Sequence, residues 1–451
     1  GDGFESATDP ENPNIVYAQA QYGWLVRYDK ASGQKVPIQP QPGKGEAAYR
    51  SNWDAPLIVS PHKSTRLYFA ANKLFKSDDR GNSWTAISHD LTRQLDRNTM
   101  SIMGSVPSVD VVMKNMSTTI YGNIVSLSES PKKQGLIYVG TDDGLIQVTE
   151  DDGANWRKID GLKDVPANTY VNDVKASMHD ENVAYVAFNN HKSGDFKPYL
   201  LKSSNKGKSW TMINTGLPER GSVYCVVEDH VDPKLLFAGT EFGVFVSNDG
   251  GANWLPLKGG LPTVAVRDID IQRQQNDLVL ATFGRGFWVL DDYSALRQIN
   301  SDVKSKDAAF LNNRPGLTFV YDSKYGYSGA GFQGASFWTA KNPAMGVQFT
   351  YYVKDVPQTA KSKRQSDEKE ARKKGTDVVY PTKEELRNEA TEEAPYFVFI
   401  VKDNSGAEVK RFTKNASSGI QTARWDGTWS QFNVSNSKSP LSKTGSAYLA
   451  I

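Results

Sequence analysis

Short runs of alternating apolar and polar residues recur along the first 300 positions of the chain. The strings "NIVYAQA", "RLYFAA", "LIYVGT", "VAYVAF", "LLFAGT" and "LVLATF" begin near residues 14, 66, 136, 183, 235 and 277. Such short alternating runs predict β-strands. Their spacing of roughly forty to seventy residues is typical of propeller blades with variable loops.

Further strand-like runs flank each of these strings. Runs such as "APLIVS" and "SVYCVVED" precede them, and runs such as "KLFKS" and "GVFVS" follow them. The intervening turns are rich in Pro, Gly, Asn and Asp, which suit chain reversal. A fourth strand is expected to begin at a Trp that follows the third. The pattern therefore predicts an all-β protein with four-stranded antiparallel blades, of which six are visible.

One octamer recurs between the predicted third and fourth strands, as "SDDRGNSW", "TEDDGANW", "SSNKGKSW" and "SNDGGANW". Ser, Thr, Asp and Asn can accept from nearby main-chain N–H groups, Gly can adopt positive φ, and Trp can bury a large ring. Calcium binding is the alternative, but Asn205 replaces the acid in one copy and no bidentate Glu follows at the required distance. We therefore expect metal-free turns. The structural positions are Ser77, Asp79, Gly81, Trp84, Thr149, Asp151, Gly153, Trp156, Ser203, Asn205, Gly207, Trp210, Ser247, Asp249, Gly251 and Trp254.

The octamer S-x-D-x-G-x-x-W resembles the Asp-box, or BNR, motif. Asp-box propellers include sialidases, xyloglucan-specific glycosidases and sortilin-type (VPS10-like) receptors. The strings "YGNIVSLSESP", "LIYVGTDDGLIQVTEDDGANW" and "GRGFWVLDD" more closely resemble bacterial sortilin-like, BNR-repeat "glycosyl hydrolase" proteins. This resemblance covers residues 1 to about 300. It implies six to eight blades, structural octamers on the side away from the ligand, and a secreted, periplasmic or cell-surface location.

The pattern changes after the predicted propeller. We expect a propeller over residues 1–300, a polar linker over 301–313, and an immunoglobulin-like β-sandwich over 314–451 that is incomplete at its C-terminal end. A highly charged insert at 358–394 has few apolar residues, which predicts solvated helices or a mobile arm. The chain opens on Gly1 without a Met and stops inside a strand-like run, so we expect a piece of a longer protein.

Composition narrows the functional classes. Lys and Arg number 53 against 51 acidic residues, a near balance that creates no long-range field for nucleic acid or an anionic membrane. No stretch approaches the length of a membrane span. The single cysteine, Cys225, allows no internal disulfide. Phosphate loops, dinucleotide fingerprints, zinc spacings and serine-protease elbows are absent from the sequence, so no cofactor is expected.

If the octamers share one face, the opposite face should carry the binding groups, because turns alternate between the two faces of an antiparallel blade. Aromatic rings beside arginines and carboxylates suit a sugar or peptide groove. The predicted ligand-binding residues are Tyr22, Arg50, Trp53, Tyr121, Asn123, Tyr170, Asn172, His191, Phe242, Arg267 and Arg285. The candidate catalytic carboxyls are Asp54, Asp142, Asp173, Glu241 and Asp268. The alternative is that these Arg and Asp side chains pair with one another around a central channel.

Two long connections, residues 86–120 and 188–199, are candidate contact surfaces because long loops in compact folds are often functional. The function predicted is an extracytoplasmic module that binds protein, peptide or glycan without chemistry. A glycoside hydrolase with two groove carboxyls is one alternative. A structural subunit of a larger envelope assembly is another. A sialidase is disfavoured, because Arg267 and Arg285 belong to one predicted blade.

Overall fold

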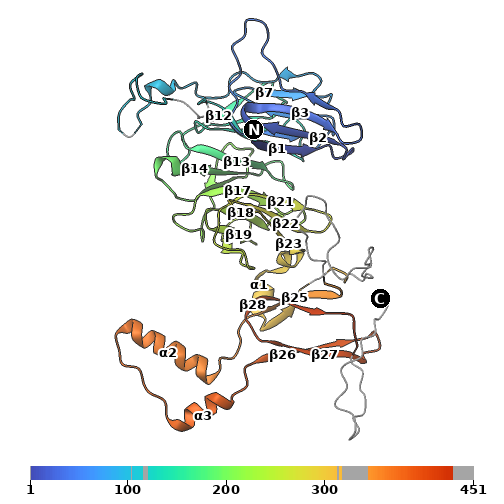
Figure 1. The fold of residues 1–451 in the computed structure, drawn as a ribbon, viewed down its shortest axis with the longest axis vertical. Coiled ribbons are helices and arrows are strands. Elements are labelled where there is room, and N and C mark those ends of the chain that lie inside the picture. Colours follow the sequence, from blue (N-terminus) through green and yellow to red (C-terminus); the bar gives the residue numbers. More distant parts are fainter. Residues whose placement is uncertain (1, 103, 115–119, 312–313, 317–343, 430–451) are drawn as a thin grey trace. The chain divides into compact units, whose positions relative to one another are not determined.

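The computed structural model describes residues 2–102, 104–114, 120–311, 314–316 and 344–429. The chain divides into two compact units, Gly1–Tyr293 and Ser294–Ile451. The first unit consists of six antiparallel sheets that follow one another in chain order, from the blue first sheet to the yellow sixth in Figure 1. Five of these sheets have four strands and the sixth has three. The predicted all-β propeller architecture is confirmed.

The first three blades follow the predicted order of strands. Blade one contains β1 (Gly3–Thr8), β2 (Ile15–Ala20), β3 (Trp24–Asp29) and β4 (Lys35–Pro37). Blade two contains β5 (Leu57–Val59), β6 (Leu67–Ala70), β7 (Leu74–Ser77) and β8 (Thr85–Ala86). Blade three contains β9 (Ile124–Glu129), β10 (Ile137–Thr141), β11 (Ile146–Thr149) and β12 (Arg157–Ile159).

The last three blades repeat this order, except that the sixth stops at its third strand. Blade four contains β13 (Tyr170–Ala176), β14 (Ala184–Asn189), β15 (Tyr199–Ser203) and β16 (Thr211–Met212). Blade five contains β17 (Val223–Glu228), β18 (Leu236–Thr240), β19 (Gly243–Ser247) and β20 (Leu255–Pro256). Blade six contains β21 (Val266–Gln272), β22 (Asp277–Thr282) and β23 (Phe287–Leu290).

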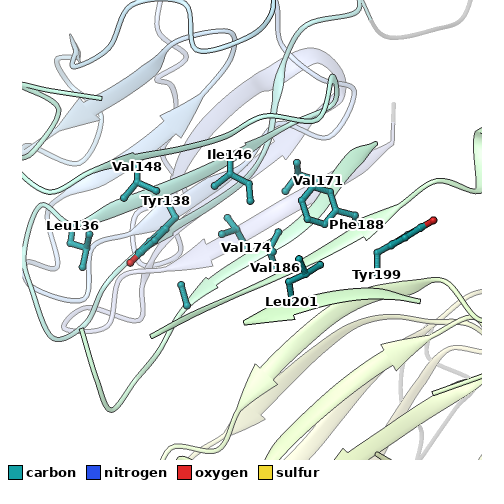
Figure 2. Close-up of a cluster of buried hydrophobic side chains, with 11 residues drawn as sticks. Leu136, Tyr138, Ile146, Val148, Val171, Val174, Val186, Phe188, Tyr199 and Leu201 are labelled. Carbon is teal, nitrogen blue, oxygen red and sulfur yellow. The ribbon is translucent and has the colours of Figure 1, made fainter. Parts of the chain in front are cut away.

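Neighbouring blades pack face to face through apolar side chains. Between blades three and four, Tyr138 and Val148 meet Val174, Val186 and other side chains of the facing sheet, and all are almost fully buried. Figure 2 shows these side chains pointing toward one another from the two sheets. Burial of one such side chain stabilises the fold by about 1.5–3 kcal/mol. Middle strands covered on both faces explain why runs such as "LIYVGT" are almost wholly apolar.

The recurring octamers form hydrogen-bonded turns. The Ser77 hydroxyl donates to Asp79 Oδ1 at 2.8 Å and accepts from the N–H of Gly81 at 2.8 Å. Gly81 has a φ of +85°, and a Cβ there would lie 2.6 Å from the side chain of Ile38. In blade four, Asn205 Oδ1 accepts from Ser203 at 3.0 Å, as Asp79 does from Ser77. The amide therefore serves this turn as well as the carboxylate.

The octamer turns lie on the same face as the turns between first and second strands. Arg80, in the octamer of blade two, is paired with Asp9 in the β1–β2 turn at 2.8 Å. Lys206, in the octamer of blade four, is paired with Glu181 in the β13–β14 turn at 3.0 Å. The turns between second and third strands therefore lie on the opposite face, as expected for four antiparallel strands.

The second unit begins with η4 (Tyr293–Gln298), which straddles its boundary, and α1 (Ser301–Ser305). One sheet has the order β24 (Ala308–Phe310), β25 (Val347–Val353), β28 (Gly419–Trp425), and β26 (Tyr396–Lys402) pairs with β27 (Glu408–Asn415). Tyr351, Val353, Phe399 and Ala423 form a small core between them. The immunoglobulin-like sandwich and the boundaries 301–313 and 314–451 stay predictions.

The charged insert at 358–394 is helical, as predicted, and comprises α2 (Ala360–Lys374) and α3 (Lys383–Thr391). Neither helix has a buried residue. Arg364 joins them through two hydrogen bonds to the carboxylate of Glu389, at 2.7 and 2.8 Å. Thr382 caps α3 in a reciprocal capping box with Glu385. The helix pair α2–α3 is therefore held together by an ion pair and by helix capping, and not by buried apolar side chains.

Candidate ligand-binding pocket

A cavity of about 710 Å³ opens on the face opposite the octamer turns. Its size lies within the range of small-molecule sites in proteins. The lining residues are Asn52, Trp53, Arg97, Met100, Ser101, Ile102, Tyr121, Asp142, Asn168, Tyr170, Asn189, Asn190, Lys192 and Ser193. The structure thereby brings together four residues singled out from the sequence, namely Trp53, Tyr121, Asp142 and Tyr170.

Both long connections contribute to this cavity. The connection 86–120 supplies Arg97, Met100, Ser101 and Ile102, and it contains the short helix η2 (Arg97–Thr99). The connection 188–199 supplies Asn189, Asn190, Lys192 and Ser193, and it contains η3 (His191–Ser193). The pocket is therefore built largely by loops that extend beyond a minimal blade.

Aromatic rings form part of the pocket wall. Trp53 precedes β5 and meets the ring of Tyr22 edge-on, with centroids 5.0 Å apart. Tyr22 is 44% exposed and adopts a φ of 60° in η1 (Gln21–Gly23). Tyr170 begins β13, and the ammonium of Lys192 lies 5.1 Å from its ring centroid. The lining rings of Trp53, Tyr121 and Tyr170 are half-buried. Aromatic rings beside amide side chains can contact a flat apolar surface of a ligand while neighbouring groups form hydrogen bonds.

Asp142 is the acidic side chain of the pocket, and its environment is specific. The carboxylate accepts from the main-chain N–H of Asn123 at 2.8 Å and of Gly122 at 3.1 Å, and from Asn123 Nδ2 at 3.2 Å. Burial raises the pKa of Asp142 to about 7, the charge of Asp143 adds to this rise, and the N–H donors oppose it. Asp143 accepts from Thr141 and the Arg93 N–H, so its carboxylate closes the adjacent turn.

A second cavity of about 310 Å³ shares Arg97 and Tyr121 with the first. Arg50 lines it, but its guanidinium is bound to Asp90 at 2.6 Å, to the Gly122 carbonyl at 3.1 Å and to Thr92 at 3.1 Å. The predicted ligand-binding arginine is therefore held by the protein itself. The pairing of Arg50 with Asp90 agrees with the alternative that Arg and Asp side chains of this face pair with one another.

Other predicted residues of this face lie outside the two cavities. Glu241 accepts from the hydroxyl of Tyr224, whose ring lies 3.9 Å from the guanidinium carbon of Arg267. Asn172 Nδ2 donates to the Tyr224 carbonyl at 2.6 Å. Phe242 is 48% exposed. These residues form a separate group on blades four to six.

His191 and Arg285 also lie outside the cavity lining. His191 Nδ1 lies 2.5 Å from Asn189 Oδ1, and burial together with the charge of Lys192 lowers the pKa of its imidazole. Arg285 lies in the exposed β22–β23 turn, where its carbonyl accepts from the indole of Trp288 at 3.2 Å.

The first strand of each blade is called its inner strand. The remaining candidate carboxyls belong to a charged cluster around Glu5 of β1, with Asp173 on β13, Asp268 on β21 and Asp54 just before β5. Asp173 lies 3.7 Å from the ammonium of Lys175 and accepts from the Val226 N–H at 3.1 Å. Glu5 is exposed, but desolvation of its carboxyl group by neighbouring atoms, followed by repulsion from Asp54 and Asp268, raises the pKa of Glu5 to about 7. Glu5 and Lys175 were not among the predicted residues. The register of β1 is irregular between Gly3 and Ser6, so no regular alternation of side chains marks Glu5 in the sequence.

The cavity suits binding better than two-carboxylate hydrolysis. Hydrolysis of a glycosidic bond requires a second carboxyl at roughly 5–9.5 Å from the first. Among the described residues that line the cavity, Asp142 is the one acidic side chain. Within the described ranges, no group of three His, Cys, Asp or Glu side chains could hold a metal ion. The fold and the cavity define a propeller with a ligand-sized pocket on the face opposite its octamer turns.

No protein-family model and no curated protein matches the chain. Among solved structures, it is similar to the GH74 xyloglucanase from Xanthomonas campestris, at 16% identity over 64% of this chain and 52% of that chain, with a TM-score of 0.39. It is also similar to the extracellular domain of a proposed hybrid two-component system from B. thetaiotaomicron, at 13% identity over 64% and 33%, with a TM-score of 0.43. A third is YCF48 from Cyanidioschyzon merolae, at 10% identity over 69% and 89%, with a TM-score of 0.42.

The chain spans about half the length of that xyloglucanase and a third of the sensor protein's extracellular domain. Likenesses at this level assign no activity to it. Across the residues that the structure describes, no helix is both long and apolar enough to cross a membrane.

Proposed function

We propose that the chain is an extracytoplasmic propeller that binds a short glycan in the pocket around Trp53 and Tyr170. The observation that carries this proposal is the composition of the pocket wall. Three aromatic rings, four asparagines and two serines line it, beside one carboxyl group and two cations. Neutral amides and hydroxyls pair with sugar hydroxyls, and aromatic rings stack on the apolar faces of sugars.

The test is binding to a panel of neutral oligosaccharides, followed by titration calorimetry with the tightest ligand. Trp53→Ala should weaken binding at least tenfold, which corresponds to about 1.4 kcal/mol. Trp24→Ala is the matched control, because Trp24 is a 42% exposed tryptophan outside the cavity lining. Equal losses in the two variants, or binding of peptides but of none of the glycans, would contradict the proposal.

A glycoside hydrolase is the second candidate, and Asp142 is the observation that favours it. A carboxyl group with a pKa near 7 is suited to donate a proton near neutral pH. Release of reducing sugar from the bound oligosaccharide distinguishes the two functions. Release that Asp142→Asn abolishes would establish the hydrolase, whereas binding without release supports the binding module.

A further inference from the structure

The connection 86–120 is closed by a neck, in which residues 90–93 contact residues 122–123, directly after the connection. A Cβ on Gly122 would lie 3.2 Å from Thr92 Oγ1, so the two sides of the neck touch. Gly122 has a φ of +88°, a conformation that glycine adopts without steric cost. Gln147 of β11 also donates to the carbonyl of Leu91, beside the neck, at 2.7 Å. The neck therefore fixes where the connection leaves and rejoins the blades.

Arg50 holds the two sides of the neck together. Its Nε donates to the Gly122 carbonyl at 3.1 Å. Its Nη2 donates to Asp90 Oδ2 at 2.6 Å and to Thr92 Oγ1 at 3.1 Å. A guanidinium is planar and donates in fixed directions, so one side chain can hold several acceptors in a set geometry. Arg50 thus bonds to both sides of the neck at once.

The β10–β11 turn holds the neck a second time. Asp142 accepts from the N–H groups of Gly122 and Asn123 at 3.1 and 2.8 Å. The next residue, Asp143, accepts from the N–H of Arg93 at 2.8 Å through its carboxylate and from Arg93 Nε at 2.7 Å through its carbonyl. Two adjacent residues of one turn therefore bind the opposite sides of the neck.

The pocket wall that follows the neck has no core of its own. Residues 93–102 include the lining residues Arg97, Met100, Ser101 and Ile102, and none of these ten residues is buried. A segment without buried side chains is fixed by its hydrogen bonds and by its ends. The position of this wall therefore depends on the neck.

We propose that Arg50 is a positioning residue for the pocket, which fixes the neck and so sets the place of the wall formed by residues 97–102. Arg50 is not among the residues that line the larger cavity, so it acts on the ligand through the wall. A wall that is already ordered costs less free energy to bind than one that the ligand must order. This inference rests on the proposed function, because it takes the ligand of the pocket to be a glycan.

Hydrogen exchange of the ligand-free protein is the first test. The N–H groups of Thr99 and Met100 donate to the carbonyls of Asp96 and Arg97 at 3.0 and 3.2 Å. Arg50→Met should speed exchange at these two amides at least tenfold and leave the amides of β18 unchanged. Because no glycan enters this measurement, its result does not depend on the proposed function.

Glycan affinity, measured by calorimetry with the tightest neutral oligosaccharide, is the second test. Arg50→Met should weaken binding at least tenfold. Arg66→Met is the matched control, because it removes an ion pair with Asp78 at 2.7 Å that lies at an octamer turn, away from the pocket. We expect Arg66→Met to leave the affinity unchanged.

Gly122→Ala disturbs the neck without removing a charge, so it should reproduce both effects of Arg50→Met even if that variant fails to fold. Gly250→Ala is its control, because Gly250 also has a positive φ, +73°, but lies in an octamer turn. Unchanged exchange at Thr99 and Met100 in the neck variants would overturn the proposal, as would an equal loss of affinity in the octamer-turn variants. If the parent protein binds no glycan, the proposed function fails and the exchange rates alone decide the role of Arg50.

Discussion

The indole N–H of Trp84 donates to the carbonyl of Ile38 at 2.6 Å and joins the octamer turn of blade two to the residue that follows β4 in blade one. Trp156 makes the same bond to Ile87 at 3.1 Å, and Trp254 makes it to Ile213 at 2.6 Å. Each of these octamers thus joins its own blade to the preceding one. The repeat is therefore part of the contact between blades as well as a turn within a blade.

The acid of the octamer should be replaceable by its amide. Asp79 Oδ1 accepts from the Ser83 N–H at 2.9 Å, and in blade four Asn205 Oδ1 accepts from the Ser209 N–H at the same distance. We expect Asp79→Asn to change the free energy of unfolding by less than about 0.5 kcal/mol and Asp79→Ala to lower it by about 1–2 kcal/mol. Urea unfolding followed by tryptophan fluorescence measures both.

The reverse change, Asn205→Asp, is the control and should be equally mild. If Asp79→Asn proves as destabilising as Asp79→Ala, the negative charge itself is required. That outcome would contradict the interpretation of the octamer as a hydrogen-bonded turn and would favour a bound cation.

The strands could be predicted from the sequence because their signals are local. The string "LIYVGT", predicted near residue 136, corresponds to β10, and "LLFAGT", predicted near 235, corresponds to β18. Alternation of side chains and turn residues such as Gly81 act over a few positions, so one chain suffices to recognise them. The three-stranded sixth blade was not predicted, and the absence of an octamer after "GFWVL" does not indicate it, because blade one lacks the octamer as well and has a fourth strand.

The pocket could be predicted only in part, because its contacts join distant segments. The face that carries Trp53 and Asp142 followed from the alternation of turns. The partners of its charged groups did not, since Arg50 is bound by Asp90, forty positions away in the chain. The path of the connection 86–120, which places Arg97 and Ile102 in the lining, has no local sequence signal.

A buried carboxylate joins blades four and five and gives a second prediction. Glu228 is 6% exposed and accepts from the Ser177 hydroxyl at 2.8 Å, the Met178 N–H at 2.6 Å and the Tyr185 hydroxyl at 3.1 Å. Glu228→Ala leaves these donors without their acceptor, so we expect it to lower the free energy of unfolding by about 3–5 kcal/mol. Glu228→Gln, which retains one oxygen acceptor, should cost less. Urea unfolding measures both variants.

Blades two and three provide an internal comparison for this carboxylate. Glu129 accepts from Ser60 at 2.5 Å, from Tyr68 at 3.2 Å and from the Gly135 N–H at 3.1 Å, so Glu129→Ala should cost about as much. Glu219→Ala is the exposed control and should stay within about 0.5 kcal/mol of the parent protein. A loss below about 1 kcal/mol for Glu228→Ala would show that water replaces the carboxylate and that the site is less enclosed than the structure indicates.

The inner-strand cluster predicts a pH dependence of stability that originates at Glu5. Glu5 is exposed at the surface of β1, yet neighbouring protein atoms displace part of the water around its carboxylate. This effect, with repulsion from Asp54 and Asp268, raises its pKa from 4.5 to about 7. The folded state therefore holds a proton that the unfolded chain releases. The stability from this group is fully present below pH 4.5 and is lost as the pH rises to about 7.

Glu5→Gln should flatten the decline in stability between pH 4.5 and 7, because the amide does not titrate. Titration of the Glu5 carboxyl carbon by NMR measures the pKa directly. Asp268→Asn should lower this pKa because it removes a repelling charge, whereas Lys175→Met should raise it because it removes an attracting one. Opposite shifts in these two variants test the cluster independently of overall stability. A Glu5 pKa near 4.5 in the parent protein, unchanged in both variants, would show that the carboxyl does not interact with the charged side chains of the inner strands.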